Sequence, residues 1–154
     1  MKKFFTLLLL SPLVFAEKNA MIPLKDFVDN LGENPGDSEL LYVTYRCAGL
    51  YGMMYGLMQN APQERAKETI KNLDEANLTI ITISELLYNK LTPEEERDFT
   101  DNLTRSVLPM ADNYQIEANT SWTNTGNYFN DYIMNDAEMC KSLVEGWNEG
   151  LKEN

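Results

Sequence analysis

The segment from residue 38 to about residue 60 constrains the fold more than any other part of the chain. Its apolar residues recur at intervals of three and four, which aligns them along one side of an α-helix. They are Leu40, Val43, Cys47, Leu50, Met54 and Leu57. The other faces carry further tyrosines, methionines and leucines, so little of this helix is polar. Because such a helix must be covered on most sides, the segment predicts the central helix of an all-α bundle.

Apolar residues at helical spacing also flank this segment on both sides. They predict further helices over about 23–31, 62–90, 93–116, 128–134 and 136–152. The chain length suits one domain, and most of the predicted connections are short enough to join antiparallel neighbours. The fold class that follows is a single-domain, all-α bundle of four to five helices.

The predicted helix boundaries depend on caps, proline and composition. Thr92, Pro93 and Glu95 form a capping box, which predicts a helix start with Glu94–Glu96 in its first turn. Pro109 predicts a break or kink near residues 107–108. Asn135 with Glu138 predicts another helix start.

Composition and glycine content give three further expectations. The polar stretch 117–127 predicts the longest linker. Residues 78–83 have a strand-like composition, but no turn residue separates them from the helical pattern on either side, so we predict helix. Gly49, Gly52 and Gly56 are expected to let a neighbouring backbone approach the central helix closely.

The first sixteen residues have the layout of a secretory signal peptide. Lys2 and Lys3 precede an apolar run over residues 4–10, and small residues end near Ala16, where a signal peptidase would cleave. The run is too short to cross a bilayer. We therefore expect a periplasmic or secreted protein, bacterial in the style of its signal, with a mature domain over residues 17–154 and no membrane insertion.

The chain contains two cysteines, Cys47 and Cys140, each on the expected inward face of its helix. In an oxidising compartment, two such cysteines most simply form one disulfide. Alternatives are a reactive thiol at Cys140, near the predicted start of the last helix, or two free buried cysteines. Because redox pairs are usually close in sequence, the spacing favours a structural disulfide between the first long helix and the last.

Charge and composition restrict the possible functions. Without Lys2 and Lys3, 11 basic residues remain against 24 acidic ones, a net charge of −13. Such a charge repels nucleic acid and attracts cationic partners, although it also simply keeps a protein soluble. The chain has no histidine, so histidine-dependent triads, haem sites and zinc sites are excluded. No pair of carboxylates has a spacing that singles it out for acid–base catalysis, so we expect no catalytic residue, metal or cofactor.

Arg46 is the residue most in need of a partner, because it lies in a helix with few other charges. It must reach solvent, meet a buried carboxylate, or anchor a ligand. With Tyr42, Tyr51 and Tyr55 it forms a candidate binding surface, since tyrosine-rich faces recur at recognition sites. The methionines of the same helix raise another possibility, an adaptable groove for a small apolar ligand.

The arrangement resembles small periplasmic all-helical proteins with one disulfide, such as the immunity proteins that protect bacteria from their neighbours' secreted toxins. The signal peptide, residues 46–52 and the distant Cys140 carry this resemblance, and it transfers no functional residue. We therefore expect a non-catalytic, acidic protein-binding module, an inhibitor or immunity-type antagonist of a cationic protein. The alternative is a carrier of a small apolar ligand in a groove lined by methionine and tyrosine. The sequence does not fix the oligomeric state.

Overall fold

The computed structural model describes residues 21–32 and 34–151, so the predicted signal peptide lies outside the described residues. These residues form helices joined by short connections, and they contain no strand. The helices are α1 (Leu24–Asp29), α2 (Asp37–Met58), α3 (Gln63–Leu91), the 3-10 helix η1 (Glu94–Glu96), α4 (Phe99–Thr125) and α5 (Asp131–Gly150). The predicted all-α class is confirmed.

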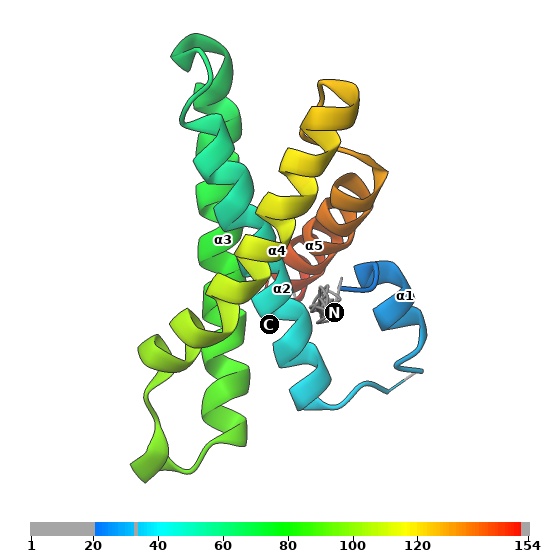
Figure 1. Cartoon of the computed structure of the whole chain (residues 1–154). Coiled ribbons are helices and arrows are strands. Elements are labelled where there is room, and N and C mark those ends of the chain that lie inside the picture. Colours follow the sequence, from blue (N-terminus) through cyan, green and yellow to red (C-terminus); the bar gives the residue numbers. More distant parts are fainter. Residues whose placement is uncertain (1–20, 33, 152–154) are drawn as a thin grey trace, which may run out of the picture.

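Helix α2 is the central element of the bundle. Figure 1 shows it running antiparallel to α3, with α4 crossing it and α5 behind α4. It packs against α3, α4 and α5. Its residues from Val43 to Tyr51 are buried without interruption, which is possible only if neighbours cover all faces of the helix. The short helix α1 packs against α5.

The predicted disulfide joins α2 to α5. Cys47 and Cys140 are completely buried, with their Cα atoms 5.4 Å apart and an S–S distance of 2.06 Å. The bond therefore fastens the central helix to the last one across a sequence separation of 93, as the positions of the two cysteines predicted.

Only one of the three central-helix glycines is used for close packing. A Cβ atom built on Gly49 would lie 2.9 Å from the Ala111 nitrogen and 3.0 Å from the Met110 Cβ, both in α4. The same atom on Gly52 or Gly56 would meet nothing within 4 Å. The expectation that glycines admit a neighbouring backbone therefore holds at Gly49 and is wrong at the other two.

This difference gives a matched prediction. We expect Gly49→Ala to lower the free energy of unfolding by about 1–3 kcal/mol, because the new methyl group would push α4 away from α2. Gly52→Ala should instead raise it by up to about 1 kcal/mol, since alanine is the better helix former and has room. Urea unfolding of both variants measures the two changes. Equal effects at both positions would contradict the assignment of Gly49 as the contact point.

Helix α4 differs most from the prediction, at its start and in its middle. It begins at Phe99, capped by Asp98, whose side chain accepts a hydrogen bond from the Asp101 N–H at 3.0 Å. Thr92 instead ends α3, so the predicted capping box is wrong. Of the break or kink predicted near residues 107–108, the break is wrong, because the helix continues through Pro109. Packing along α2 on both sides of the proline outweighs the one backbone hydrogen bond that it cannot make.

The predicted linker over residues 117–127 is largely the last part of α4. Tyr114, Ala118 and Ser121 continue its buried face, and Gly126 ends the helix in a left-handed conformation with φ 73°. The threonines of this part donate their hydroxyl hydrogens to carbonyls one turn earlier, for example Thr120 to Ile116 at 2.8 Å. Polar composition was therefore misleading, because the polar groups are satisfied within the helix.

The two predicted C-terminal helices are one. Helix α5 starts after Asn130, whose side chain accepts from the Ile133 N–H at 3.0 Å, and it passes through Asn135 without a break. Its buried face is Ile133, Asp136 and Cys140. The carboxylate of Asp136 obscured this stripe in the sequence. Residues 78–83 are helical, as predicted, and lie within α3.

Candidate functional site

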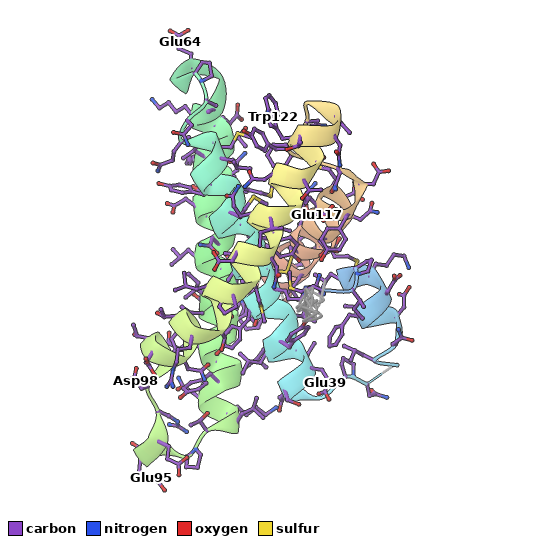
Figure 2. The ribbon with its side chains drawn as sticks, in the orientation of Figure 1. Glu39, Glu64, Glu95, Asp98, Glu117 and Trp122 are labelled. Carbon is purple, nitrogen blue, oxygen red and sulfur yellow. A yellow bond between two sulfur atoms is a disulfide. The ribbon has the colours of Figure 1, made fainter. Side chains whose placement is uncertain are left out.

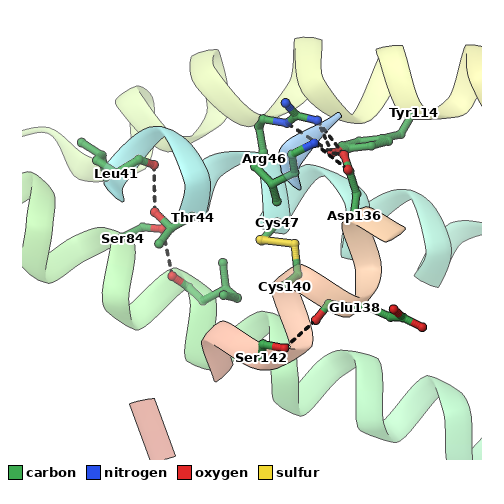
Figure 3. Close-up of a disulfide and its surroundings, with 12 residues drawn as sticks. Leu41, Thr44, Arg46, Cys47, Ser84, Tyr114, Asp136, Glu138, Cys140 and Ser142 are labelled. Carbon is green, nitrogen blue, oxygen red and sulfur yellow. Dashed lines mark hydrogen bonds and ion pairs between the residues drawn. A yellow bond between two sulfur atoms is a disulfide. The ribbon is translucent and has the colours of Figure 1, made fainter. Parts of the chain in front are cut away.

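Arg46 forms a fully buried ion pair with Asp136. Its Nη2 atom lies 2.6 Å from Asp136 Oδ2, and both side chains have no exposed area. Figure 3 shows the pair beside the disulfide, bridging α2 and α5 as the disulfide does. Of the three possibilities that the sequence left open for Arg46, the structure has the buried arginine–carboxylate pair.

Two tyrosines complete the hydrogen bonding of this pair. The Tyr114 hydroxyl accepts from Arg46 Nη2 at 3.1 Å and donates to Asp136 Oδ2 at 2.6 Å. The Tyr132 hydroxyl accepts from Arg46 Nη2 at 3.3 Å. We call Arg46, Tyr114, Tyr132 and Asp136 the buried cluster. It joins α2, α4 and α5 through charge-assisted hydrogen bonds, which are the stronger kind.

The buried cluster also holds the segment that precedes α1. Arg46 Nη1 donates to the Ile22 carbonyl at 2.6 Å, and the Tyr132 hydroxyl donates to the Met21 carbonyl at 3.1 Å. The Leu24 N–H donates to Asp136 Oδ1 at 2.7 Å. Every one of these groups is satisfied by the chain itself, so the cluster has a structural role and is closed to a ligand.

Burial controls the acid–base behaviour of four tyrosines. It raises the pKa of Tyr45, Tyr51 and Tyr132 to about 12, and Glu145 contributes to the rise at Tyr51. Burial also raises the pKa of Tyr114 above its ordinary range; Arg46 opposes this shift and Asp136 adds to it. These phenols therefore remain protonated in the folded protein at pH values where an exposed tyrosine has ionised.

The free energy of unfolding should fall as the pH rises from 10 to 12, because these tyrosines ionise later in the folded protein than in the unfolded chain. In the unfolded chain these phenols lose their protons near pH 10, whereas the folded protein holds them to about pH 12. The folded state binds more protons in between, so the stabilisation is complete below pH 10 and is lost as the pH rises to 12. Urea unfolding at stepped alkaline pH measures the loss. A Tyr132→Phe variant should lose less over the same range.

The four residues of the predicted binding surface do not form an exposed patch. Arg46 is buried in the cluster, and Tyr51 is only 5% exposed. Tyr42 is half-buried, its ring 4.7 Å from that of Phe27 in α1. Tyr55 is half-buried and points to a different neighbour, α3, with which it lines a hollow. A central helix covered on all sides cannot present these four side chains together.

Sequence reasoning missed the partners of Arg46. Asp136, Tyr114 and Tyr132 lie 90, 68 and 86 residues away from it along the chain. One signal could have identified Asp136, which stands one helical turn before Cys140 and so on the same face as that cysteine. A carboxylate on a buried stripe needs a cation, and Arg46 beside Cys47 was the unpaired candidate.

An acidic tip projects from the connection between α3 and α4. Glu94, Glu95 and Glu96 form η1 and are exposed, as is Asp98. Figure 2 shows Glu95 at one extreme end of the molecule and Asp98 further in, at the start of α4. Among the described residues, none of these four carboxylates makes an ion pair. We call Glu94, Glu95, Glu96 and Asp98 the acidic tip.

Arg97 lies between Glu96 and Asp98 in the sequence, but its guanidinium binds the end of α3 and not the acidic tip. Arg97 donates from Nε to the Thr92 carbonyl at 2.9 Å and from Nη2 to the Asn89 carbonyl at 2.7 Å. It therefore caps the end of α3 and leaves its acidic neighbours uncompensated. The expectation that the dipole of a following helix stabilises Glu94–Glu96 is wrong, because α4 starts only at Phe99.

Elsewhere on the surface, most cations are paired with carboxylates of the same chain. Four of the exposed pairs link residues one helical turn apart: Lys25–Asp29, Lys71–Glu75, Arg105–Asp101 and Lys141–Glu145. Lys90 reaches from α3 to Asp37 of α2 at 2.7 Å. Each of these pairs neutralises one carboxylate of the same chain.

A polar hollow of about 230 Å³ lies between α2 and α3. It is lined by Tyr51, Gly52, Tyr55, Leu73, Asp74 and Asn77. Within the described part of the chain, Asn77 Oδ1 is the one buried side-chain oxygen or nitrogen without a hydrogen-bond partner. We call this feature the α2–α3 hollow.

Two further hollows are mainly apolar. One of about 330 Å³ lies between the end of α2 and the α4–α5 connection, lined by Leu57, Met58, Asn60, Ala61, Tyr128 and Phe129. Another of about 290 Å³ lies where the loop after α1 meets α2 and α5. Of the segment 42–58, beside which a groove was predicted, residues 43–51 are buried, and Leu57 and Met58 at its end line the first of these hollows.

Over residues 21–32 and 34–151, no helix is long and apolar enough to cross a bilayer, and no three carboxylates or cysteines converge as metal ligands would. Comparison with known proteins finds no matching family model, no matching curated protein and no matching solved structure. The function is therefore argued from the residues of this chain.

Proposed function

We propose that this chain is an exported, non-catalytic module that binds a cationic protein, in the manner of an inhibitor or an immunity-type antagonist. The signal-like residues 1–16 and the buried disulfide support a periplasmic or secreted location, since disulfides persist in oxidising compartments. The excess of 24 acidic over 13 basic residues in the sequence supports a cationic partner.

The observation that carries this proposal is the acidic tip. Four carboxylates stand within five consecutive residues, and they are exposed and form no ion pair among the described residues, with the intervening Arg97 engaged elsewhere. Asp98 caps α4, but Glu94–Glu96 lie outside that helix and gain nothing from its dipole. Repulsion between neighbouring carboxylates is relieved when a cationic surface docks on them, which favours association and speeds encounter.

Neutralising the tip tests the proposal. The triple variant Glu94→Gln, Glu95→Gln, Glu96→Gln should bind immobilised poly-L-lysine about tenfold more weakly at low salt, from about 0.5 kcal/mol lost per exposed charge. The control carries the same charge change at exposed sites away from the tip: Asp112→Asn, Glu138→Gln and Glu149→Gln. The same pair of proteins is then compared for retention of basic proteins from the extracytoplasmic fraction.

The outcomes separate a local site from a general charge effect. A larger loss for the tip variant than for the control supports the tip as the docking point. Equal losses would mean that net charge alone governs binding and would contradict the proposal. So would binding that is insensitive to salt, because exposed charge pairs are screened within about 8–10 Å at physiological ionic strength.

The apolar hollow at the end of α2 supports a second candidate function, a carrier of a small apolar ligand. Its walls combine Leu57 and Met58 with the rings of Tyr128 and Phe129, a lining typical of ligand pockets. Native mass spectrometry of the purified protein tests this candidate. A co-purified lipid that is lost in a Met58→Glu variant would support it, and a bare protein that takes up no added fatty acid would exclude it.

A further inference from the structure

One residue that lines the α2–α3 hollow, Asn77, carries an acceptor without a donor among the described residues. Asn77 Oδ1 is buried but has no hydrogen-bond partner among the described residues. A buried acceptor without a donor is costly, because it has lost its hydrogen bonds to water and gained none in the folded protein. Buried polar atoms in folded proteins are nearly always paired, so an unpaired one at the wall of a hollow indicates that a donor enters from outside.

The hollow has room for a side chain. Its volume of about 230 Å³ exceeds the roughly 30 Å³ that one water occupies in the liquid, so it can admit several waters or the end of a long side chain. Gly52 leaves one wall open, since a Cβ atom there would touch nothing within 4 Å. The opening therefore comes from the absence of a side chain on α2 at this position.

The charges around the hollow favour a cationic donor. Asp74 stands on its lining, exposed, and makes no ion pair among the described residues. Glu145 of α5, which is paired with Lys141, also acts on the Tyr51 hydroxyl. No described cation lies on the lining. A neutral donor would form a hydrogen bond with Asn77 Oδ1, but the negative charges of Asp74 and Glu145 would not attract it.

The aromatic and apolar walls suit the stem of such a donor. Lysine and arginine carry donors and no acceptor on their charged ends, and their methylene stems pack well on apolar surface. Leu73 and the rings of Tyr51 and Tyr55 provide that surface. A tyrosine face also attracts a guanidinium or ammonium group.

We propose that the α2–α3 hollow receives a single lysine or arginine side chain of the cationic partner, whose N–H donates to Asn77 Oδ1 while its charge lies beside Asp74. This inference rests on the proposed function, to which it adds the chemical group that is recognised. The hollow is separate from the acidic tip, so the two features are open to independent tests.

The test uses n-butylguanidinium, which has the charged end and part of the stem of arginine. Titration into the full mature protein is followed by the NMR signals of the Asn77 side-chain amide and the Tyr51 and Tyr55 rings. We expect saturable shifts at these signals. The uncharged analogue n-butylurea should shift these signals only at severalfold higher concentrations, because it has the same shape without the charge.

Matched variants locate the binding. Gly52→Leu should fill the hollow and abolish the shifts, whereas Gly56→Leu, one turn further along α2 and equally unobstructed, should retain them. Asp74→Asn should weaken binding about threefold to fivefold, as expected for one exposed charge, and Asp112→Asn should leave it unchanged. Thermal unfolding of each variant verifies that the fold is intact.

Each outcome is decisive. Absence of shifts at Asn77, equal binding of n-butylurea, or full binding by Gly52→Leu overturns the inference. If tip neutralisation still weakens poly-L-lysine binding in that case, the proposed function stands without the hollow. If n-butylguanidinium binds at Asn77 but no cationic protein or polymer binds, the hollow is real and the proposed function is wrong.

Discussion

Replacing Asp136 by alanine is expected to lower the free energy of unfolding by about 3–5 kcal/mol, because it leaves the Arg46 guanidinium buried without a counter-charge. The same change removes the acceptors of the Leu24 N–H and the Tyr114 hydroxyl, both of which are buried. Such a loss is a large part of the stability of a domain of this size. Urea unfolding followed by circular dichroism measures it.

Two comparison variants show whether the loss of stability comes from the unpaired Arg46 charge or from any substitution in α5. Glu138→Ala, at an exposed position half a turn away, should change stability by no more than about 0.5 kcal/mol. The double variant Arg46→Met, Asp136→Asn removes both charges and keeps an acceptor for Leu24. It should be less destabilised than the sum of its single variants, since each single variant leaves one buried charge unpaired and the double variant leaves none. Additive losses would contradict a direct ion pair.

Removing the disulfide is the second large effect. The variant Cys47→Ala, Cys140→Ala should lose about 4–5 kcal/mol, because the bond closes a loop with a sequence separation of 93 and so restricts the unfolded chain. Differential scanning calorimetry with and without reductant measures the loss. Reductant should destabilise the natural protein and leave the double alanine variant unchanged. An effect of reductant on that variant would show that it acts elsewhere.

The buried cluster and the disulfide connect the same two helices at adjacent positions. Arg46 and Cys47 are neighbours on α2, and Asp136 lies one turn before Cys140 on α5. Because they share this junction, loss of one should change the contribution of the other, and their effects should not simply add. The disulfide keeps the two helices close even when the charges are unpaired, so Asp136→Ala should be more damaging in the reduced protein.

The helical part of the fold was largely predictable because it depends on local periodicity. The three-and-four spacing along residues 40–57 predicted a central helix, and the two cysteines on inward faces predicted the disulfide. The two errors in the C-terminal part of the fold share one cause, which is that polar residues were taken to interrupt helices. Thr120 in α4 and Asn135 in α5 are helical, because packing of the opposite face determines the helix and their own side chains do not oppose it.

The candidate site was much less predictable. Arg46 was singled out correctly as a residue that needs a partner, but Tyr42, Tyr51 and Tyr55 do not share an exposed face with it. The acidic tip was visible in the sequence as three consecutive glutamates, yet its role depends on where α4 begins. The α2–α3 hollow had no sequence signal, since it arises from the open side of Gly52 facing Asp74 and Asn77 on another helix.

The sequence by itself determined what each segment can do locally: which stretches are helical, which faces are apolar, and that the chain carries an excess of carboxylates. These properties follow from spacing and composition along a few consecutive turns. Only the tertiary structure decided which carboxylate neutralises Arg46, which glycine lies against α4, and which acceptor remains unpaired. Those outcomes depend on contacts between residues far apart in the chain, and the packing of whole helices selects one set of contacts from many that the local pattern allows.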